Sequence, residues 1–285
     1  MSFVPHSIDD KNEIFDSLGI ESYDQLFEHI PDELYLKEDI DIENEKSELE
    51  LIDLFNNIGS KNEQDLICFA GNGHYDSYLP HTVKSLTMRP EFMTSYTPYQ
   101  AEISQGVLQA LFEFQSLVAD VTDMELANAS LYDGTTSVVE AVSMAIAKTK
   151  KRKVLLSEGL NSRAIEALNT IIDTNDIALE SIPYDEGFKH TNLVIDDQVA
   201  CVVFSLPTTH GSIQDFKEIN SVIKEAGAIS VCLLDPSILG VVETPGRMGF
   251  DIVVSEGQSI GSPMSFGGPT VGWFATRKEY ARLIP

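Results

Sequence analysis

From about residue 66 onward, the sequence alternates between short apolar runs and longer segments with helical spacing. The runs are rich in β-branched residues and nearly continuous, which is typical of strands covered on both faces. They lie at residues 153–157, 177–182, 200–206, 229–234 and 251–255, and residues 273–275 are a candidate for one late strand. Helical spacing is found at residues 104–122, 135–149, 161–173 and 214–226. This alternation predicts an α/β fold with a mostly parallel sheet.

The first 65 residues have a different pattern, that of short amphipathic helices. A serine followed three residues later by an acid or an amide occurs three times, each time with a Gly or Pro placed to end the helix: Ser7-x-x-Asp10 with Gly19, Ser22-x-x-Gln25 with Pro31, and Ser47-x-x-Glu50 with Gly59. This spacing is that of a capping box, in which serine and the later side chain each bind a free backbone N–H group. We therefore expect three capped helices before the main body.

The charge of the chain is strongly negative and unevenly distributed. Nineteen Lys and Arg oppose 45 Asp and Glu, which gives a net charge of −26, and −15 of it lies in residues 1–65. A surface this acidic repels phosphate backbones and anionic headgroups, so we expect no general binding to nucleic acid or membrane surfaces. There is no run of about 18 apolar residues that could span a bilayer. The N-terminus also lacks the basic and apolar parts of a signal peptide, and we expect a cytoplasmic protein.

The thiols and imidazoles do not have the spacing of a metal site. The three cysteines are Cys68, Cys201 and Cys232. They are far apart in the sequence, form no CxxC pair and sit in apolar stretches, so we expect buried, reduced thiols. His74, Asp76 and His81 carry metal-ligating groups, but the two histidines are seven residues apart with a proline between them. We therefore predict no metal site.

Polar loops after the predicted strands are the candidate ligand-binding segments, because ligands of open parallel sheets bind beyond the carboxyl ends of the strands. Asp235 directly follows a buried strand, and a long Gly/Ser-rich loop, residues 255–269, follows the next strand. In the segment 128–137, Asp133, Gly134 and Thr135 precede an apolar helix whose first N–H groups could hold an anion. Two further segments, residues 71–80 and 96–106, are rich in Tyr and amides.

A strand-end acid, an anion loop at a helix start and a later polar loop together resemble the aspartate-aminotransferase type, or fold type I, of pyridoxal-phosphate enzyme. In that fold the acid pairs with the pyridinium ring, the loop holds the phosphate, and a lysine after the later strand forms the Schiff base. This chain has no lysine between Lys224 and Lys278. We therefore expect that it does not hold pyridoxal phosphate covalently.

Five segments of the sequence closely resemble one known family. They are Gly71-Asn-Gly-His-Tyr-Asp-Ser-Tyr-Leu-Pro80, Tyr96-Thr-Pro-Tyr-Gln-Ala-Glu-Ile-Ser-Gln-Gly106, Asn128-Ala-Ser-Leu-Tyr-Asp-Gly134, Ser255-Glu-Gly-Gln-Ser259 and Ser265-Phe-Gly-Gly-Pro269. The family is subunit 1, the alpha subunit, of the two-subunit glycine dehydrogenase (decarboxylating), the P-protein of the glycine cleavage system. In subunit 2 a His-Lys-Thr sequence lies a fixed distance before Gly-Gly-Pro. The same distance, counted back from Pro269, places Gln258 where that lysine would be.

The resemblance implies a heterotetrameric enzyme that removes the carboxylate of glycine and passes the aminomethyl group to the lipoyl arm of the H-protein. Subunit 2 would supply the Schiff-base lysine and bind the pyridoxal phosphate. Subunit 1 would supply interface and part of the channel wall, with these candidates: His74, Tyr96, Tyr99, Gln100, Glu102 and Ser104. By the same resemblance, Asp133, Gly134, Thr135 and Asp235 would be relics of a cofactor site.

The resemblance also predicts the domain organisation. We expect an acidic helical arm at residues 1–65 and a large pyridoxal-phosphate-transferase-like domain at residues 66–285. Members of the family continue beyond the Arg-Leu-Ile-Pro with which this chain ends. The small C-terminal domain is therefore expected to be missing.

Two other functions remain open from the sequence. The chain could be an independent pyridoxal-phosphate lyase that uses a distant lysine, such as Lys84 or Lys189. It could also be a non-catalytic scaffold or regulatory pseudo-subunit that only binds a partner. The first predicts an absorption near the imine band that is lost on borohydride trapping, and the second predicts that adding this chain to subunit 2 does not change turnover.

Overall fold

The computed structural model describes most of the chain and divides it into two compact units, Met1–Ile67 and Cys68–Pro285. The described residues are 6–38, 40–63, 65–67, 69–93, 97–172, 176–185, 187, 189–190 and 193–285.

The N-terminal unit contains two α-helices and two short 3₁₀ helices. They are α1 (Ile8–Leu18), η1 (Tyr23–Phe27), η2 (Asp32–Leu34) and α2 (Glu48–Gly59). The predicted capping boxes at Ser7 and Ser47 are both formed, which confirms those two helices. Gly19 ends α1 in the left-handed conformation, with φ of 66°, which glycine adopts without steric cost.

The helix predicted after Ser22 is wrong as an α-helix. The segment forms only the five-residue η1, and the Ser22 side chain makes no capping hydrogen bond. The Gln25 side chain accepts instead from the backbone N–H of Glu21, at 2.6 Å. No residue of η1 is buried. The helices α1 and α2 also have no buried residue, but each has a complete capping box, so the missing cap bond at Ser22 is what distinguishes η1 from them.

The C-terminal unit is built on one seven-stranded sheet. Its strands are β1 (Leu126–Ala127), β2 (Lys153–Ser157), β3 (Ala178–Ile182), β4 (Val199–Leu206), β5 (Ile229–Leu234), β6 (Ile252–Glu256) and β7 (Gly272–Thr276). They are ordered β1-β7-β6-β5-β4-β2-β3. Strands β2 to β6 pair in parallel, and β7 is antiparallel to both of its neighbours. The predicted mostly parallel sheet is therefore confirmed.

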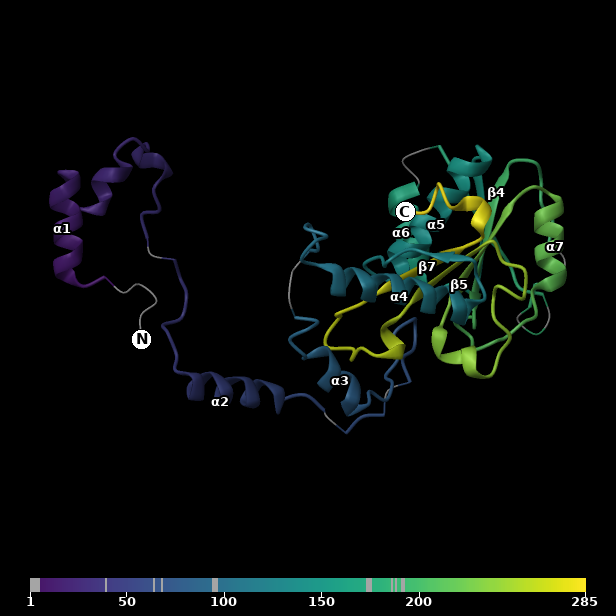
Figure 1. The fold of residues 1–285 in the computed structure, drawn as a ribbon, viewed down its shortest axis with the longest axis horizontal. Coiled ribbons are helices and arrows are strands. Elements are labelled where there is room, and N and C mark those ends of the chain that lie inside the picture. Colours follow the sequence, from purple (N-terminus) through teal and green to yellow (C-terminus); the bar gives the residue numbers. More distant parts are fainter. Residues whose placement is uncertain are drawn as a thin grey trace. The chain divides into compact units, whose positions relative to one another are not determined.

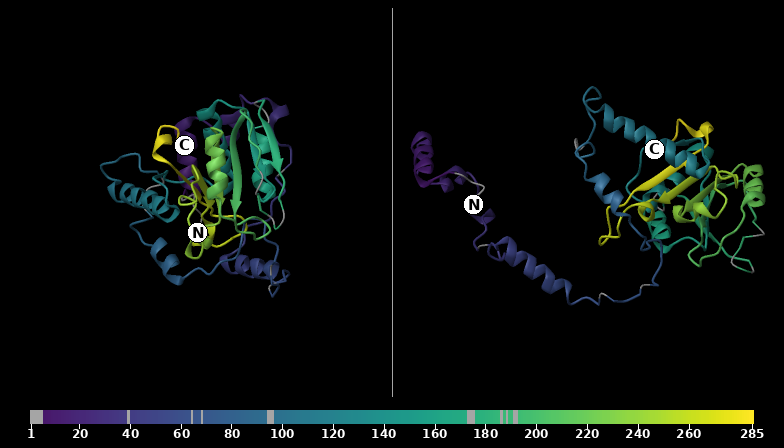
Figure 2. Two further views of the ribbon diagram at one scale, coloured as in Figure 1. Left: turned by 90° about the vertical axis from the view of Figure 1, so that its right-hand side faces the viewer. Right: turned by 60° about the horizontal axis from the view of Figure 1, so that its bottom comes forward.

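Helices cover both faces of this sheet (Figure 1 and Figure 2). These covering helices are α4 (Gln105–Thr122), α5 (Gly134–Thr149), α6 (Ser162–Ile172) and α7 (Lys217–Glu225). The unit also contains α3 (His81–Thr87) and the 3₁₀ helices η4 (Pro236–Gly240), η5 (Gln258–Ile260) and η6 (Lys278–Tyr280). One core cluster lies between the sheet and α5 and α6, and the other lies between the sheet and α4 and α7. Alternate strand residues point to opposite faces: Val203 belongs to the first cluster and Phe204 to the second.

Most predicted element boundaries agree with the structure within three residues, while β1, α3 and the 3₁₀ helices were not predicted. Cys201 and Cys232 are free and buried, as expected, and burial raises the pKa of both thiols. Cys68 lies outside the described residues. Among the residues that are described, no helix is both long and apolar enough to cross a membrane.

Candidate functional site

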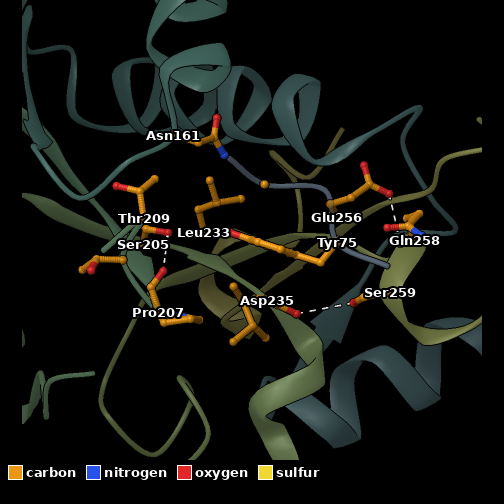
Figure 3. Close-up of a pocket in the computed structure, with 13 residues that line it drawn as sticks. Tyr75, Asn161, Ser205, Pro207, Thr209, Leu233, Asp235, Glu256, Gln258 and Ser259 are labelled. Carbon is orange, nitrogen blue, oxygen red and sulfur yellow. Dashed lines mark hydrogen bonds between the residues drawn. The ribbon is translucent and has the colours of Figure 1, made fainter. Parts of the chain in front are cut away.

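A pocket lies at the carboxyl ends of β4, β5 and β6, where the topology of the sheet predicts a ligand site (Figure 3). It contains about 560 Å³ of space, part of it open to solvent. The lining residues come from loops that follow these strands and from the Tyr-rich segment: Gly73, Tyr75, Asn161, Ser205, Pro207, Thr208, Thr209, Leu233, Leu234, Asp235, Glu256, Gln258 and Ser259. None of these described lining residues is a lysine, an arginine or a histidine. The pocket is therefore lined by two carboxylates and neutral groups.

Asp235 stands at the end of β5, where the sequence places a ligand-binding acid. The six residues of β5 are all buried, and Pro236 then starts the short helix η4, which fixes the position of the carboxylate. Its Oδ1 atom accepts from the backbone N–H of Ser237 at 3.0 Å and from the Ser259 hydroxyl at 3.4 Å. The carboxylate is half-buried and lines the pocket, so the arrangement retains an acid that can receive a cationic ligand group.

Gln258 occupies the position where the resemblance expects a lysine, and its side chain is held in place. Only 3% of the residue is exposed. Its Nε2 atom donates to the carbonyl oxygen of Ser262 at 2.7 Å, and its backbone N–H donates to Glu256 at 3.0 Å. The second contact is visible as a dashed line in Figure 3. An amide cannot form an imine, so this residue supplies no nucleophile.

The start of α5 is the predicted anion loop, and two of its backbone N–H groups donate to carboxylates of the chain itself. Asp133 is the N-cap, and its Oδ1 atom accepts from the N–H of Thr136 at 2.7 Å. Glu256 reaches the same helix end, where its Oε2 atom accepts from the N–H of Gly134 at 2.9 Å. The two backbones come so close that a Cβ atom at Gly134 would lie 2.7 Å from the Glu256 nitrogen. Glycine is therefore required there by close approach.

The Tyr-rich segment contributes to the pocket, while most of the predicted channel residues lie outside it. Tyr75 lines the pocket, and His74 lines a smaller neighbouring hollow with Arg163, whose guanidinium lies 3.2 Å from His74 Nδ1. The other predicted wall residues divide by exposure: Tyr99, Gln100 and Glu102 are exposed, Ser104 is buried, and Tyr96 lies outside the described residues.

Several lining residues were not predicted, and Glu256 is the most important of them. It lies in the 255–269 loop that the sequence singles out, at the end of β6, but nothing marked its side chain. Asn161 was also missed; its side chain caps α6 by accepting from the N–H of Ala164 at 2.8 Å. Their positions just after strand ends were the available signal.

These residues do not fit a covalently bound pyridoxal phosphate. Asp235 could face a pyridinium ring, but by the resemblance Gln258 stands where the lysine would be. The N–H groups of Gly134 and Thr136 at the start of α5 are already bound by Glu256 and Asp133. Lys84 and Lys189, the alternative lysines, are exposed and do not line the pocket. No catalytic step through the cofactor is assigned to this chain.

Comparison with known proteins shows the family of this chain. The model of the family described as glycine cleavage system P-protein matches residues 1–285, the full chain. The chain belongs to the glycine cleavage system P-protein family. A relative within it, the probable glycine dehydrogenase (decarboxylating) subunit 1 of Desulforamulus reducens, is 41% identical over 290 residues, which are 100% of this chain and 65% of the relative.

Solved structures support the assignment to the P-protein family and its fold. A crystal structure of glycine decarboxylase (P-protein) in inhibitor-bound form superposes with a TM-score of 0.89 at 36% identity, covering 100% of this chain and 65% of that one. A sphingosine-1-phosphate lyase of Burkholderia pseudomallei has a TM-score of 0.64 at 11% identity, covering 88% of this chain and 63% of the lyase, and shows the fold alone. This chain therefore has the fold type I architecture and spans about 65% of the length of its P-protein relatives.

Proposed function

We propose that this chain acts as subunit 1 of a two-subunit glycine dehydrogenase (decarboxylating) and has no cofactor chemistry of its own. The observation that carries the proposal is Gln258, which is buried and hydrogen-bonded at the strand-end position where this fold needs a lysine. Support also comes from relatives along the whole chain that are named subunit 1 of this enzyme. The missing lysine then has a simple reason, because a second subunit supplies it.

In the proposed assembly, a heterotetramer, pyridoxal phosphate is bound by subunit 2 and provides the electron sink for decarboxylation of glycine. The aminomethyl group passes to the lipoyl arm of the H-protein. We place this enzyme in the cytoplasm. His74, Tyr96, Tyr99, Gln100, Glu102 and Ser104 remain the proposed channel and interface residues. The high exposure of Tyr99, at 89%, supports a role for this loop in contacting a partner.

The surface of the C-terminal unit supports a contact with another protein chain. On α4, Phe112 is 67% exposed and Leu117 is 61% exposed, and on the loops near the pocket Tyr132 is 87% exposed. Exposed large apolar side chains in such number are typical of surfaces that bind other proteins. We propose that subunit 2 covers α4. The independent-lyase alternative is disfavoured because Lys84 and Lys189 lie away from the pocket.

The experiment is a titration of this chain into purified subunit 2 with lipoylated H-protein, measuring carbon dioxide released from glycine. We expect the rate to rise from near zero and saturate at one copy of each subunit. The variant Phe112→Asp should raise the concentration of this chain needed for half-maximal rate by at least tenfold. The matched change Val222→Asp, at an exposed position on α7, should leave that concentration unchanged. A rate that is already maximal without this chain would contradict the proposal and favour a scaffold or regulatory role.

A further inference from the structure

The N-terminus of α5 lies beside the pocket, where Gly134, Thr135 and Glu256 line the smaller neighbouring hollow. By the fold resemblance this helix start is where a cofactor phosphate would bind, and here a side chain binds to it instead. Helix N-termini bind anions because their first N–H groups have no partner within the helix and carry partial positive charge. In this chain Glu256 Oε2 accepts from the Gly134 N–H at 2.9 Å, and Asp133 accepts from Thr136. Two of the first N–H groups of α5 are therefore already bound by carboxylates of this chain.

Glu256 does more than cap the helix, because its second oxygen binds two other segments. Oε1 accepts from the backbone N–H of Gln258 at 3.0 Å and from that of Val271 at 3.2 Å. One carboxylate thus links the start of α5, the loop after β6 and the residue before β7. Hydrogen bonds from N–H groups to an ionised carboxylate are roughly twice as strong as those between neutral groups. The pocket can keep its shape without any bound ligand.

The carboxylates around Glu256 also disfavour a second anion. Glu256, Asp133 and Asp235 supply three carboxylates at or beside the pocket. Arg163, which is exposed, lines the same small hollow as Gly134 and Glu256, and its guanidinium there lies beside His74. A phosphate at Gly134 would have to displace the Glu256 carboxylate from three N–H donors. Two like charges competing for one set of donors are strongly unfavourable in a partly dry site.

We propose that Glu256 is an intramolecular substitute for the cofactor phosphate, and that it excludes phosphate-bearing cofactors from this pocket independently of the missing lysine. Glu256 is therefore a specificity-determining residue that acts by excluding phosphate groups. Glu256 and its hydrogen-bond partners all belong to this chain, so this exclusion does not depend on the assembly with subunit 2.

The test is a double-mutant comparison on the full chain, with pyridoxal phosphate and pyridoxal as the two probes. The variants are Gln258→Lys, Glu256→Ala/Gln258→Lys and, as a matched control, Glu140→Ala/Gln258→Lys, in which an exposed acid of α5 is removed instead. The readouts are the imine absorption band and the amount of pyridoxyl group fixed at position 258 after borohydride reduction.

We expect Gln258→Lys and the Glu140 control to take up both probes weakly and about equally, because the phosphate gains no contact. The Glu256→Ala/Gln258→Lys variant should prefer pyridoxal phosphate over pyridoxal by at least tenfold, and inorganic phosphate should compete with that uptake. Equal preference in all three variants, or full preference already in Gln258→Lys, would overturn the proposal.

A second measurement covers the case in which the alanine variant does not fold. Glu256→Gln retains the size of the side chain and removes its charge. Inorganic phosphate should raise the melting temperature of this variant and leave that of the wild-type chain unchanged. The same shift in both proteins would overturn the proposal, since phosphate would then bind while the carboxylate is in place.

Discussion

The three N–H groups that converge on Glu256 make the variant Glu256→Gln strongly destabilising for so small a change. Both carboxylate oxygens accept hydrogen bonds: Oε2 accepts from the backbone N–H of Gly134, and Oε1 accepts from the backbone N–H groups of Gln258 and Val271. A glutamine has one oxygen and one NH₂ group in the same space. Whichever way the amide is turned, at least one backbone N–H faces another donor, and the charge that strengthened the other bonds is gone.

The magnitude follows from these contacts. A hydrogen bond to a charged group contributes about 1.5–3 kcal/mol, and a buried donor left without a partner costs about 1–3 kcal/mol. Because Glu256 is half-buried, we expect a loss of about 1.5–3 kcal/mol in the free energy of unfolding. At roughly 2–4 °C per kcal/mol for a unit of this size, the melting temperature should fall by about 3–12 °C.

Urea unfolding followed by the fluorescence of Trp273, the single tryptophan, measures this loss. Trp273 is 8% exposed and pairs with Ser255 across β6 and β7, so it reports on the site directly. The matched control is Glu140→Gln at an exposed position of α5, expected within about 0.5 kcal/mol of wild type. A loss for Glu256→Gln no larger than that of the control would refute the reasoning.

Three further predictions concern packing and protonation. Gly134→Ala should destabilise by about 1–3 kcal/mol because the new Cβ would lie within 3 Å of the Glu256 backbone, while Gly106→Ala, with open space around it at the start of α4, should be neutral or slightly stabilising in the same melting assay. Leu168→Ala, at a fully buried position, should cost about 2–5 kcal/mol in urea unfolding. Burial lowers the pKa of His190, so the unfolded chain binds that proton more readily than the folded chain does. The contribution of His190 to the free energy of unfolding should therefore be fully present above about pH 6.5 and be lost on acidification. His190→Asn should flatten this part of a pH–stability profile.

The fold could be predicted because its strands and helices carry strong local signals. β4 and β5 are nearly continuous apolar runs, and in the structure they are buried on both faces, so pattern and environment agree. The two-residue strand β1 has no such signal, since its pairing with β7 is set by tertiary contacts alone. The helix that does not form after Ser22 shows the converse: the Ser-x-x-Gln spacing is present, but the capping bond is not made and Gln25 binds the backbone N–H of Glu21 instead.

The candidate site could be predicted in part, for a topological reason. Asp235 and Gln258 follow strands, and parallel strands bring their carboxyl ends to one edge, so both were expected at the pocket and both line it. The role of Glu256 could not be predicted from the sequence, because its partner Gly134 is 122 residues away and its partner Val271 is 15 residues away. Only the sheet register brings these donors to one carboxylate.

The central claim, that this chain contributes no covalent cofactor site to the enzyme, is tested most directly in the assembled complex with subunit 2 and pyridoxal phosphate. Borohydride reduction fixes any imine, and intact-mass measurement of each separated chain then shows which one carries the pyridoxyl group. The account predicts that subunit 2 alone gains it and that the mass of this chain does not change. A pyridoxyl group on a lysine of this chain, such as Lys84 or Lys189, would contradict it.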